Sequence, residues 1–198
     1  MKETAARGED PVSNALYAVA GAALVVGLLV AFAWLPRLIH GQDEGVGKDA
    51  PAMKVPIVAN AQALVDLSVA PGPPALAPTE VSLADLKGHP IVLDFWATWC
   101  GPCQAEAPIV DRVATRFKKR GLVVIGVNTS DQSGLAGPWA KAHHLQYPIA
   151  FDDGPAAQAF EVSQLPTLVV ISKNGKIVGR RTGMTEGEEI ERLVNQGF

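Results

Sequence analysis

The stretch that decides the fold runs from residue 94 to residue 103 and reads Asp94-Phe95-Trp96-Ala97-Thr98-Trp99-Cys100-Gly101-Pro102-Cys103. Residues 91–96 are apolar except for Asp94. Such a short apolar run is typical of a central strand covered on both faces. Residues 104–120 are predicted to be a helix, because they end in three basic residues followed by Gly121. A buried strand therefore passes directly into a helix at the two cysteines.

The rest of the domain alternates between short strands and helices. The predicted elements are a buried strand at 122–127, helices at 138–144 and 155–161, strands at 168–172 and 176–180, and a last helix at 185–195. Asn174-Gly175 favours a type I′ hairpin turn between the last two strands. Thr185 and Glu188 have the spacing of a capping box. This order predicts an α/β fold whose central mixed sheet is parallel at first and antiparallel at the end, with helices on its faces.

The two cysteines are the only ones in 198 residues and stand three positions apart. A secreted domain held by disulfides has more, widely spaced cysteines, and a structural zinc site needs four ligands. Cys100 is expected at a helix N-terminus, where the helix dipole and free N–H groups stabilise a thiolate. We therefore expect Cys100 to be an exposed nucleophile. Cys103, one turn later, is expected to be the more buried resolving cysteine.

Asp94 is an acid inside a strand that should be buried. A buried carboxyl group has a raised pKa and could exchange a proton with Cys103 near neutral pH. Two structural alternatives stay open at this point. Asp94 could lie at the edge of the sheet, or a neighbouring donor could hold it without any role in the chemistry.

Other polar and aromatic residues carry weaker signals. Trp99 is either part of the core or an apolar contact for a partner's disulfide. His143 and His144 point about 100° apart on a helix, which favours packing over a shared metal. The net charge is −3 and no basic stripe is present, so nucleic acid is not an expected partner. We expect neither a cofactor nor a metal site.

The N-terminal region predicts a membrane anchor. Residues 15–35 contain no charge over about 21 positions, enough helix to cross a bilayer core. The expected organisation is a short cytoplasmic tail at 1–14, a transmembrane anchor at 15–35, a linker at 36–60 and a domain at 61–198. A cleavable signal peptide is the alternative, because Ala31-Phe32-Ala33 resembles a cleavage site.

The segment from Asp94 to Cys103 resembles the active-site segment of the thioredoxin superfamily. Together with Val81-Ser82-Leu83-Ala84-Asp85-Leu86-Lys87-Gly88, it is similar to the TlpA/ResA-type branch of membrane-tethered bacterial thioredoxin-like proteins. This resemblance implies a thioredoxin-like fold with a subfamily insertion, found here at about 128–153. It also implies thiol:disulfide oxidoreductase activity on the periplasmic, outer side of the cytoplasmic membrane.

The resemblance also assigns roles to single residues. Cys100 matches the family's nucleophile, Cys103 its resolving cysteine and Asp94 its buried acid. Pro108 matches the proline that kinks the active-site helix. The step Leu165-Pro166-Thr167 matches a substrate-binding loop with a cis-proline.

One position departs from the thioredoxin pattern. Gly126 stands where thioredoxins have a lysine close to the buried acid, so Asp94 lacks that charge partner.

The function expected from these signals is reduction of disulfides in exported proteins, for example during cytochrome c maturation. The reducing equivalents would come from a membrane thiol carrier of the DsbD/CcdA type. Two alternatives remain from the residues alone: an oxidase that forms disulfides, and a non-catalytic metallochaperone or binding module.

Overall fold

The computed structural model describes residues 19–31, 45–67 and 77–198, and the chain divides into two units between residues 41 and 42. In the first unit, residues 19–31 are helical. No helix within the described ranges is both long enough and apolar enough to span a bilayer. The expected tail at 1–14 and parts of the expected anchor and linker, at 15–18 and 32–44, lie outside the described residues.

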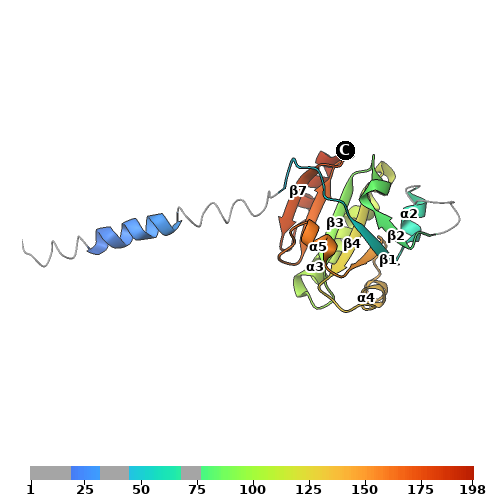
Figure 1. Ribbon diagram of the computed structural model, residues 1–198, viewed down its shortest axis with the longest axis horizontal. Helices are drawn as coiled ribbons and strands as arrows, with labels where there is room; N and C mark the ends of the chain where they lie inside the picture. The colour runs from blue at the N-terminus through green and yellow to red at the C-terminus, as the bar shows by residue number, and fades with distance from the viewer. Residues whose placement is uncertain (1–18, 32–44, 68–76) are drawn as a thin grey trace, which may run out of the picture. The chain divides into compact units, whose positions relative to one another are not determined.

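The second unit is built on a seven-stranded mixed sheet with the strand order β2-β1-β5-β4-β3-β6-β7 (Figure 1). The strands are β1 (Lys54–Ala59), β2 (Glu80–Ser82), β3 (Ile91–Trp96), β4 (Val123–Thr129), β5 (Ile149–Asp152), β6 (Thr167–Ile171) and β7 (Ile177–Thr182). β3, β4 and β5 are parallel, whereas the pairs β3–β6 and β6–β7 are antiparallel. The predicted change from parallel to antiparallel pairing along the chain is confirmed.

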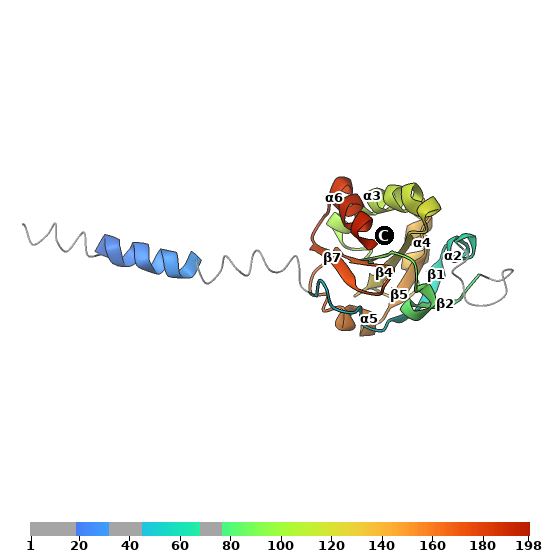
Figure 2. The same cartoon turned by 90° about the horizontal axis from the view of Figure 1, so that it is seen from above.

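Helices cover both faces of this sheet, as Figure 2 shows. They are α2 (Gln62–Asp66), α3 (Gly101–Phe117), α4 (Ala136–Ala142), α5 (Pro155–Ala159) and α6 (Gly187–Gly197), with 3₁₀ turns η1 (Leu83–Leu86) and η2 (Lys118–Arg120). α3, α4 and α6 pack with Val92 and Trp96 of β3 in one apolar cluster. η1, α2 and α5 pack with Leu93 and Phe95 in the other. Because side chains alternate along a strand, Asp94 faces the α3 side.

The domain begins earlier than the expected boundary at residue 61. β1 occupies residues expected to be linker, and its Val55 is buried together with Met53 just before it. The chain at Gly47 already bonds to the last hairpin, where its N–H donates to the carbonyl of Ile177 at 2.8 Å. Pro51 and Pro56 interrupt this stretch, and prolines argue against a strand inside a sheet. Residues 45–60 therefore belong to the domain, and the predicted linker is wrong over this range.

The hairpin turn between β6 and β7 differs from the predicted type. A type I′ turn needs positive φ at both central residues, but of the pair Asn174-Gly175 only Gly175 has one, at 80°. The Gly175 N–H donates to the Ser172 carbonyl at 2.8 Å, and the Ser172 N–H donates to the Lys176 carbonyl at 2.8 Å. The loop is therefore one residue longer, with Gly175 as its left-handed residue.

The predicted capping box at Thr185 is wrong. α6 begins at Gly187 with Glu186 as its N-cap, and no side chain in the described part of the chain caps it. Thr185 is buried, and its backbone N–H donates instead to Glu106 of α3 at 2.6 Å. A contact between residues far apart in the chain has replaced the local one that the sequence favoured.

Candidate active site

Cys100 and Cys103 form a disulfide at the point where β3 leads into α3. Cys100 is the N-cap of α3, and its Sγ accepts the N–H of Cys103 at 3.2 Å. Pro102 stands in the first turn, where a missing N–H costs nothing. A helix N-terminus has unpaired N–H groups and partial positive charge, and both favour a thiolate at Cys100 after reduction.

The two cysteines are equally buried in this disulfide form, with 4% and 3% of their surface exposed. The predicted contrast, in which Cys100 is exposed and Cys103 buried, is therefore absent here. Both residues belong to the apolar cluster that contains Trp96 and Ala107. Because one covalent bond joins the sulfurs, Cys100 is held against this cluster together with Cys103.

Asp94 lies under this disulfide-bearing helix, buried in a central strand and 2% exposed. Its position between β4 and β6 excludes the alternative of an acid at the sheet edge. The Tyr147 hydroxyl donates to its Oδ2 at 3.5 Å, and Oδ1 has no hydrogen-bond partner among the described residues. Burial, and then the charge of Glu106, raise the pKa of Asp94 well above its usual value, although the Tyr147 bond opposes them.

Glu106 is a second buried acid, which our reading of the sequence missed. It lies one turn after Cys103 and is only 1% exposed. Its Oε1 accepts the Thr185 N–H, and its Oε2 has no partner in the described parts of the chain. Burial raises the pKa of Glu106 to about 7, against the lowering effect of the bonds from Thr185. The helical spacing of the sequence indicates this burial, because Glu106 lies on the same face of the helix as Cys103, Ala107 and Val110, which are all buried.

Tyr147 lies beside Asp94, in the space left by the missing side chain of Gly126. Gly126 pairs with Asp94 across β3 and β4, and a Cβ at Gly126 would lie 2.8 Å from Cε2 of Tyr147. Burial and the nearby carboxyl groups, Asp94 first among them, raise the pKa of the Tyr147 phenol well above its usual value. Asp94 therefore faces a neutral hydroxyl rather than an ammonium group.

The Leu165–Pro166 peptide bond is cis, as the resemblance implied. Pro166 immediately precedes β6, where Thr167 pairs with Phe95 of β3. This register places the loop at the same end of the sheet as Cys100. The Pro166 carbonyl accepts the Gly183 N–H at 2.8 Å, which joins the loop to the turn after β7.

Two large apolar side chains are exposed in loops at this end of the sheet. Trp99 is 65% exposed, which excludes the core alternative, and its indole N–H donates to the Ser130 carbonyl at 2.9 Å. Met184 is 50% exposed between Gly183, which bonds to Pro166, and Thr185, which bonds to Glu106. His143, by contrast, stacks on Trp139 with ring centroids 3.7 Å apart, in agreement with a packing role.

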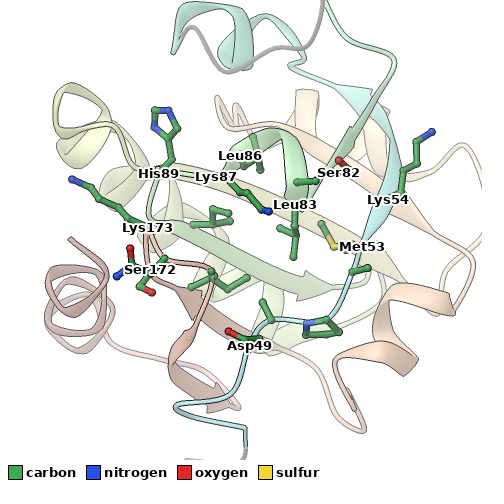
Figure 3. A pocket seen from close by; sticks show the side chains of 18 residues that line it. Asp49, Met53, Lys54, Ser82, Leu83, Leu86, Lys87, His89, Ser172 and Lys173 are labelled. Atoms are coloured by element: carbon green, nitrogen blue, oxygen red, sulfur yellow. The ribbon is translucent and has the colours of Figure 1, made fainter.

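A cavity of about 660 Å³ lies elsewhere, beside the first residue of β3 (Figure 3). Its lining comes from residues 49–54, from 82–84, 86, 87, 89 and 91, and from 171–175, and it includes the buried side chains of Met53, Leu86 and Ile91. Neither cysteine lines it. Since Cys100 follows the other end of β3, this cavity is separate from the disulfide site.

Comparison of the sequence with known proteins assigns this chain to a family. The profile of the AhpC/TSA family matches residues 46–180. A thiol-disulfide oxidoreductase ResA of Bacillus cereus is 32% identical over 118 residues, which are 59% of this chain and 68% of the relative. ResA of Bacillus subtilis is 36% identical over 108 residues, 54% of this chain and 60% of that protein.

The fold comparison agrees with the sequence comparison. A crystal structure described as thiol:disulfide interchange protein DsbE from Chlorobium tepidum superimposes with a TM-score of 0.64 at 26% identity. The superposition covers 77% of this chain and 96% of that one. The chain therefore belongs to the AhpC/TSA family and, as a relative of the ResA enzymes, is a thiol–disulfide oxidoreductase.

Proposed function

We propose that Cys100 and Cys103 reduce disulfides in protein substrates. In the reduced enzyme the Cys100 thiolate attacks one sulfur of a substrate disulfide, forms a mixed disulfide and releases the other substrate sulfur as a thiolate. Cys103 then loses its proton and attacks Sγ of Cys100. This closes the Cys100–Cys103 disulfide and releases the second substrate thiolate, so two electrons pass from enzyme to substrate. The observation that carries this proposal is the backbone N–H of Cys103 directed at the Cys100 sulfur.

Asp94 is proposed to receive the proton that Cys103 must lose. The carboxyl group is buried on the α3 side of the sheet, and its raised pKa makes the ionised form a stronger base than an ordinary carboxylate. Glu106, with a pKa of about 7, supplies a second buried carboxyl group that contributes to the raised pKa of Asp94. An ionised Glu106 makes the Asp94 carboxylate a stronger base, which favours transfer of the Cys103 proton to Asp94.

Substrate binding is proposed at the surface formed by Trp99 and by the cis-proline loop at Leu165 and Pro166. An extended substrate segment can pair with the backbone of such a loop. The exposure of Trp99 and the position of Pro166 at the cysteine end of β3 support this assignment.

The biological setting is also proposed. Similarity to ResA and DsbE supports disulfide-containing proteins as substrates. We propose that these are exported proteins, with apocytochrome disulfides before haem attachment as one class, and that a DsbD/CcdA-type membrane carrier donates the electrons. The uncharged residues 15–35 support a single N-terminal anchor in a bacterial cytoplasmic membrane. The thioredoxin-like domain would then face the periplasmic side.

Substrate trapping tests the proposal. In the full-length Cys103→Ala variant, the mixed disulfide at Cys100 cannot be resolved, so exported cysteine-containing proteins should accumulate on it. The Cys100→Ala/Cys103→Ala double variant is the matched control, because it has no thiol to trap with. Failure of Cys103→Ala to capture more exported thiol proteins than the double variant would contradict the proposed function.

A further inference from the structure

The short loop at residues 97–99, which joins β3 to Cys100, is held from the side by the loop that follows β4. The carboxylate Oδ2 of Asp131 accepts the backbone N–H of Thr98 at 2.6 Å. The next residue, Trp99, donates its indole N–H to the carbonyl of Ser130 at 2.9 Å. Two consecutive residues before the nucleophile are therefore bound to two consecutive residues of another loop.

Asp131 is itself held in place by several donors. Its Oδ2 also accepts the side-chain amide of Asn128 at 3.0 Å, and its Oδ1 accepts the N–H of Gln132 at 2.8 Å. Burial acts to raise the pKa of Asp131, but these bonds and the one from Thr98 outweigh it and lower the pKa, so the group is a carboxylate at neutral pH. Hydrogen bonds to an ionised acceptor are stronger than those between neutral groups.

The backbone beside Asp131 adopts an uncommon conformation. Ser130 has a φ of 54°, in the left-handed region that residues other than glycine rarely occupy. Such a conformation persists only where the surrounding bonds fix it. It allows the Ser130 carbonyl to meet the Trp99 indole while the neighbouring side chain reaches Thr98.

We propose that Asp131 is a positioning residue, which fixes the 97–99 loop so that Trp99 stands as a preformed contact for the substrate next to the cysteines. Trp99 is 65% exposed, so hydrogen bonds to the 130–131 loop rather than burial determine where it lies. A side chain ordered before binding loses less entropy when a partner docks. The inference rests on the proposed substrate contact at Trp99 and names a residue outside the cysteine segment that controls it.

Amide hydrogen exchange on the full-length chain tests the hydrogen bond itself. In Asp131→Ala the Thr98 amide should exchange at least about tenfold faster than in the wild type, while the amides of β3 and β4 keep their rates. The control is Asp153→Asn, because Asp153 is an exposed acid in the loop after β5, outside the 97–99 and 130–131 loops. Unchanged exchange at Thr98 in Asp131→Ala overturns the inference, whatever the activity of the enzyme.

Steady-state kinetics test the consequence for substrate binding. With insulin as disulfide substrate and dithiothreitol as reductant, Asp131→Ala should raise KM about three- to tenfold and change kcat less than about twofold. In a Trp99→Ala background the same change should leave KM unaltered, because the contact that Asp131 positions is already gone. Equal effects of Asp131→Ala in both backgrounds, or a fall in kcat at constant KM, overturn the inference.

A variant that keeps the shape of the side chain protects the test from misfolding. If Asp131→Ala does not fold, Asp131→Asn replaces it. The donors that share the two carboxylate oxygens of Asp131 in the wild type then have a single carbonyl oxygen to bind in the variant. The same criteria for Thr98 exchange and for KM in both backgrounds then apply. Failure of the wild type and Cys100→Ala to differ in insulin reduction would instead contradict the proposed function, and the Thr98 measurement separates the two failures.

Discussion

Gly126 lies directly opposite Asp94 in the parallel register of β4 and β3, and its missing side chain leaves the space that the Tyr147 ring occupies. A Cβ at this position would lie 2.8 Å from Cε2 of Tyr147 and 3.0 Å from Nε1 of Trp96. The hydrogen-bond donor that the buried acid receives here is consequently the neutral Tyr147 hydroxyl group. The absence of a side chain at Gly126 thus allows Tyr147 to lie beside Asp94 and donate to it.

Substitution of Gly126 should therefore destabilise the protein. We expect Gly126→Ala to lower the free energy of unfolding by about 1–3 kcal/mol, because the added methyl group overpacks a site enclosed by Tyr147, Ile149 and Trp96. Denaturant unfolding of the full-length chain measures this change. Gly101→Ala is the control, since a Cβ there meets no atom within 4 Å. Equal stability of the two variants would show that the ring packing at Gly126 is not tight.

Glu106 should make stability depend on pH. Its pKa is about 7 in the folded protein against 4.5 in the unfolded chain, so the folded state holds the extra proton between these values. The contribution of protonated Glu106 to the free energy of unfolding is complete below pH 4.5 and is lost as the pH rises through 7. The free energy of unfolding of Glu106→Gln should change less across about pH 5–8 than that of the wild type. At the upper end of that range the variant should therefore gain of the order of 3 kcal/mol relative to the wild type.

The matched control for this measurement is Glu188→Gln, because Glu188 is exposed in the first turn of α6. Unfolding free energies measured at intervals from acid to mildly alkaline pH give the comparison. The free energy of unfolding of Glu106→Gln should still fall to some extent as the pH rises, since the pKa of Asp94 is also raised in the folded protein. Parallel curves for the wild type and Glu106→Gln would refute the assignment.

Arg180 should be a strong contributor to stability. Its guanidinium group is buried, with donors 2.6 Å from the Phe160 carbonyl and 2.8 Å from the Glu161 carbonyl. Arg180→Met should cost about 2–4 kcal/mol, because two carbonyl groups lose their partner. Arg116→Met removes an exposed ion pair with Glu191 and a contact with the Phe117 ring at 6.0 Å, and should cost less than about 1 kcal/mol. Similar unfolding midpoints for the two variants would contradict this prediction.

The start of the domain can be tested by truncation. A chain of residues 61–198 lacks β1 and the buried side chains of Met53 and Val55, each of which contributes about 1.5–3 kcal/mol. A chain of residues 45–198 keeps them. We expect the longer form to melt cooperatively, and the shorter form to melt far lower or not to fold, as followed by circular dichroism. Equal melting temperatures would restore the boundary at residue 61.

The sequence predicted those features that depend on neighbours in the chain. The apolar run of β3 and the helix signals around Gly121 locate the elements, and Cys100 and Cys103 carry their own chemical signal. The contact between Glu106 and Thr185 could not be predicted in this way, because the two residues are 79 positions apart. The local sequence therefore predicts a helix cap at Thr185, whereas its backbone N–H donates to the buried carboxylate of Glu106.

The bond from Thr98 to Asp131 illustrates the same limit. It joins two loops 33 residues apart, and only the parallel pairing of β3 and β4 brings those loops together. The sequence predicts the start of the domain at residue 61, after β1, for a related reason. β1 is stabilised by pairing with β2 and β5 and by burial, and its own proline-containing sequence gives little sign of a strand.

The reduction potential of the Cys100–Cys103 pair tests the central claim most directly. The full-length chain, in mild detergent, is equilibrated with dithiothreitol or glutathione buffers, and the fraction of disulfide is measured. A protein that reduces disulfides should have a potential near that of thioredoxin, about −270 mV. A value near about −120 mV, typical of a strong oxidant, would contradict the account and indicate disulfide formation as the reaction.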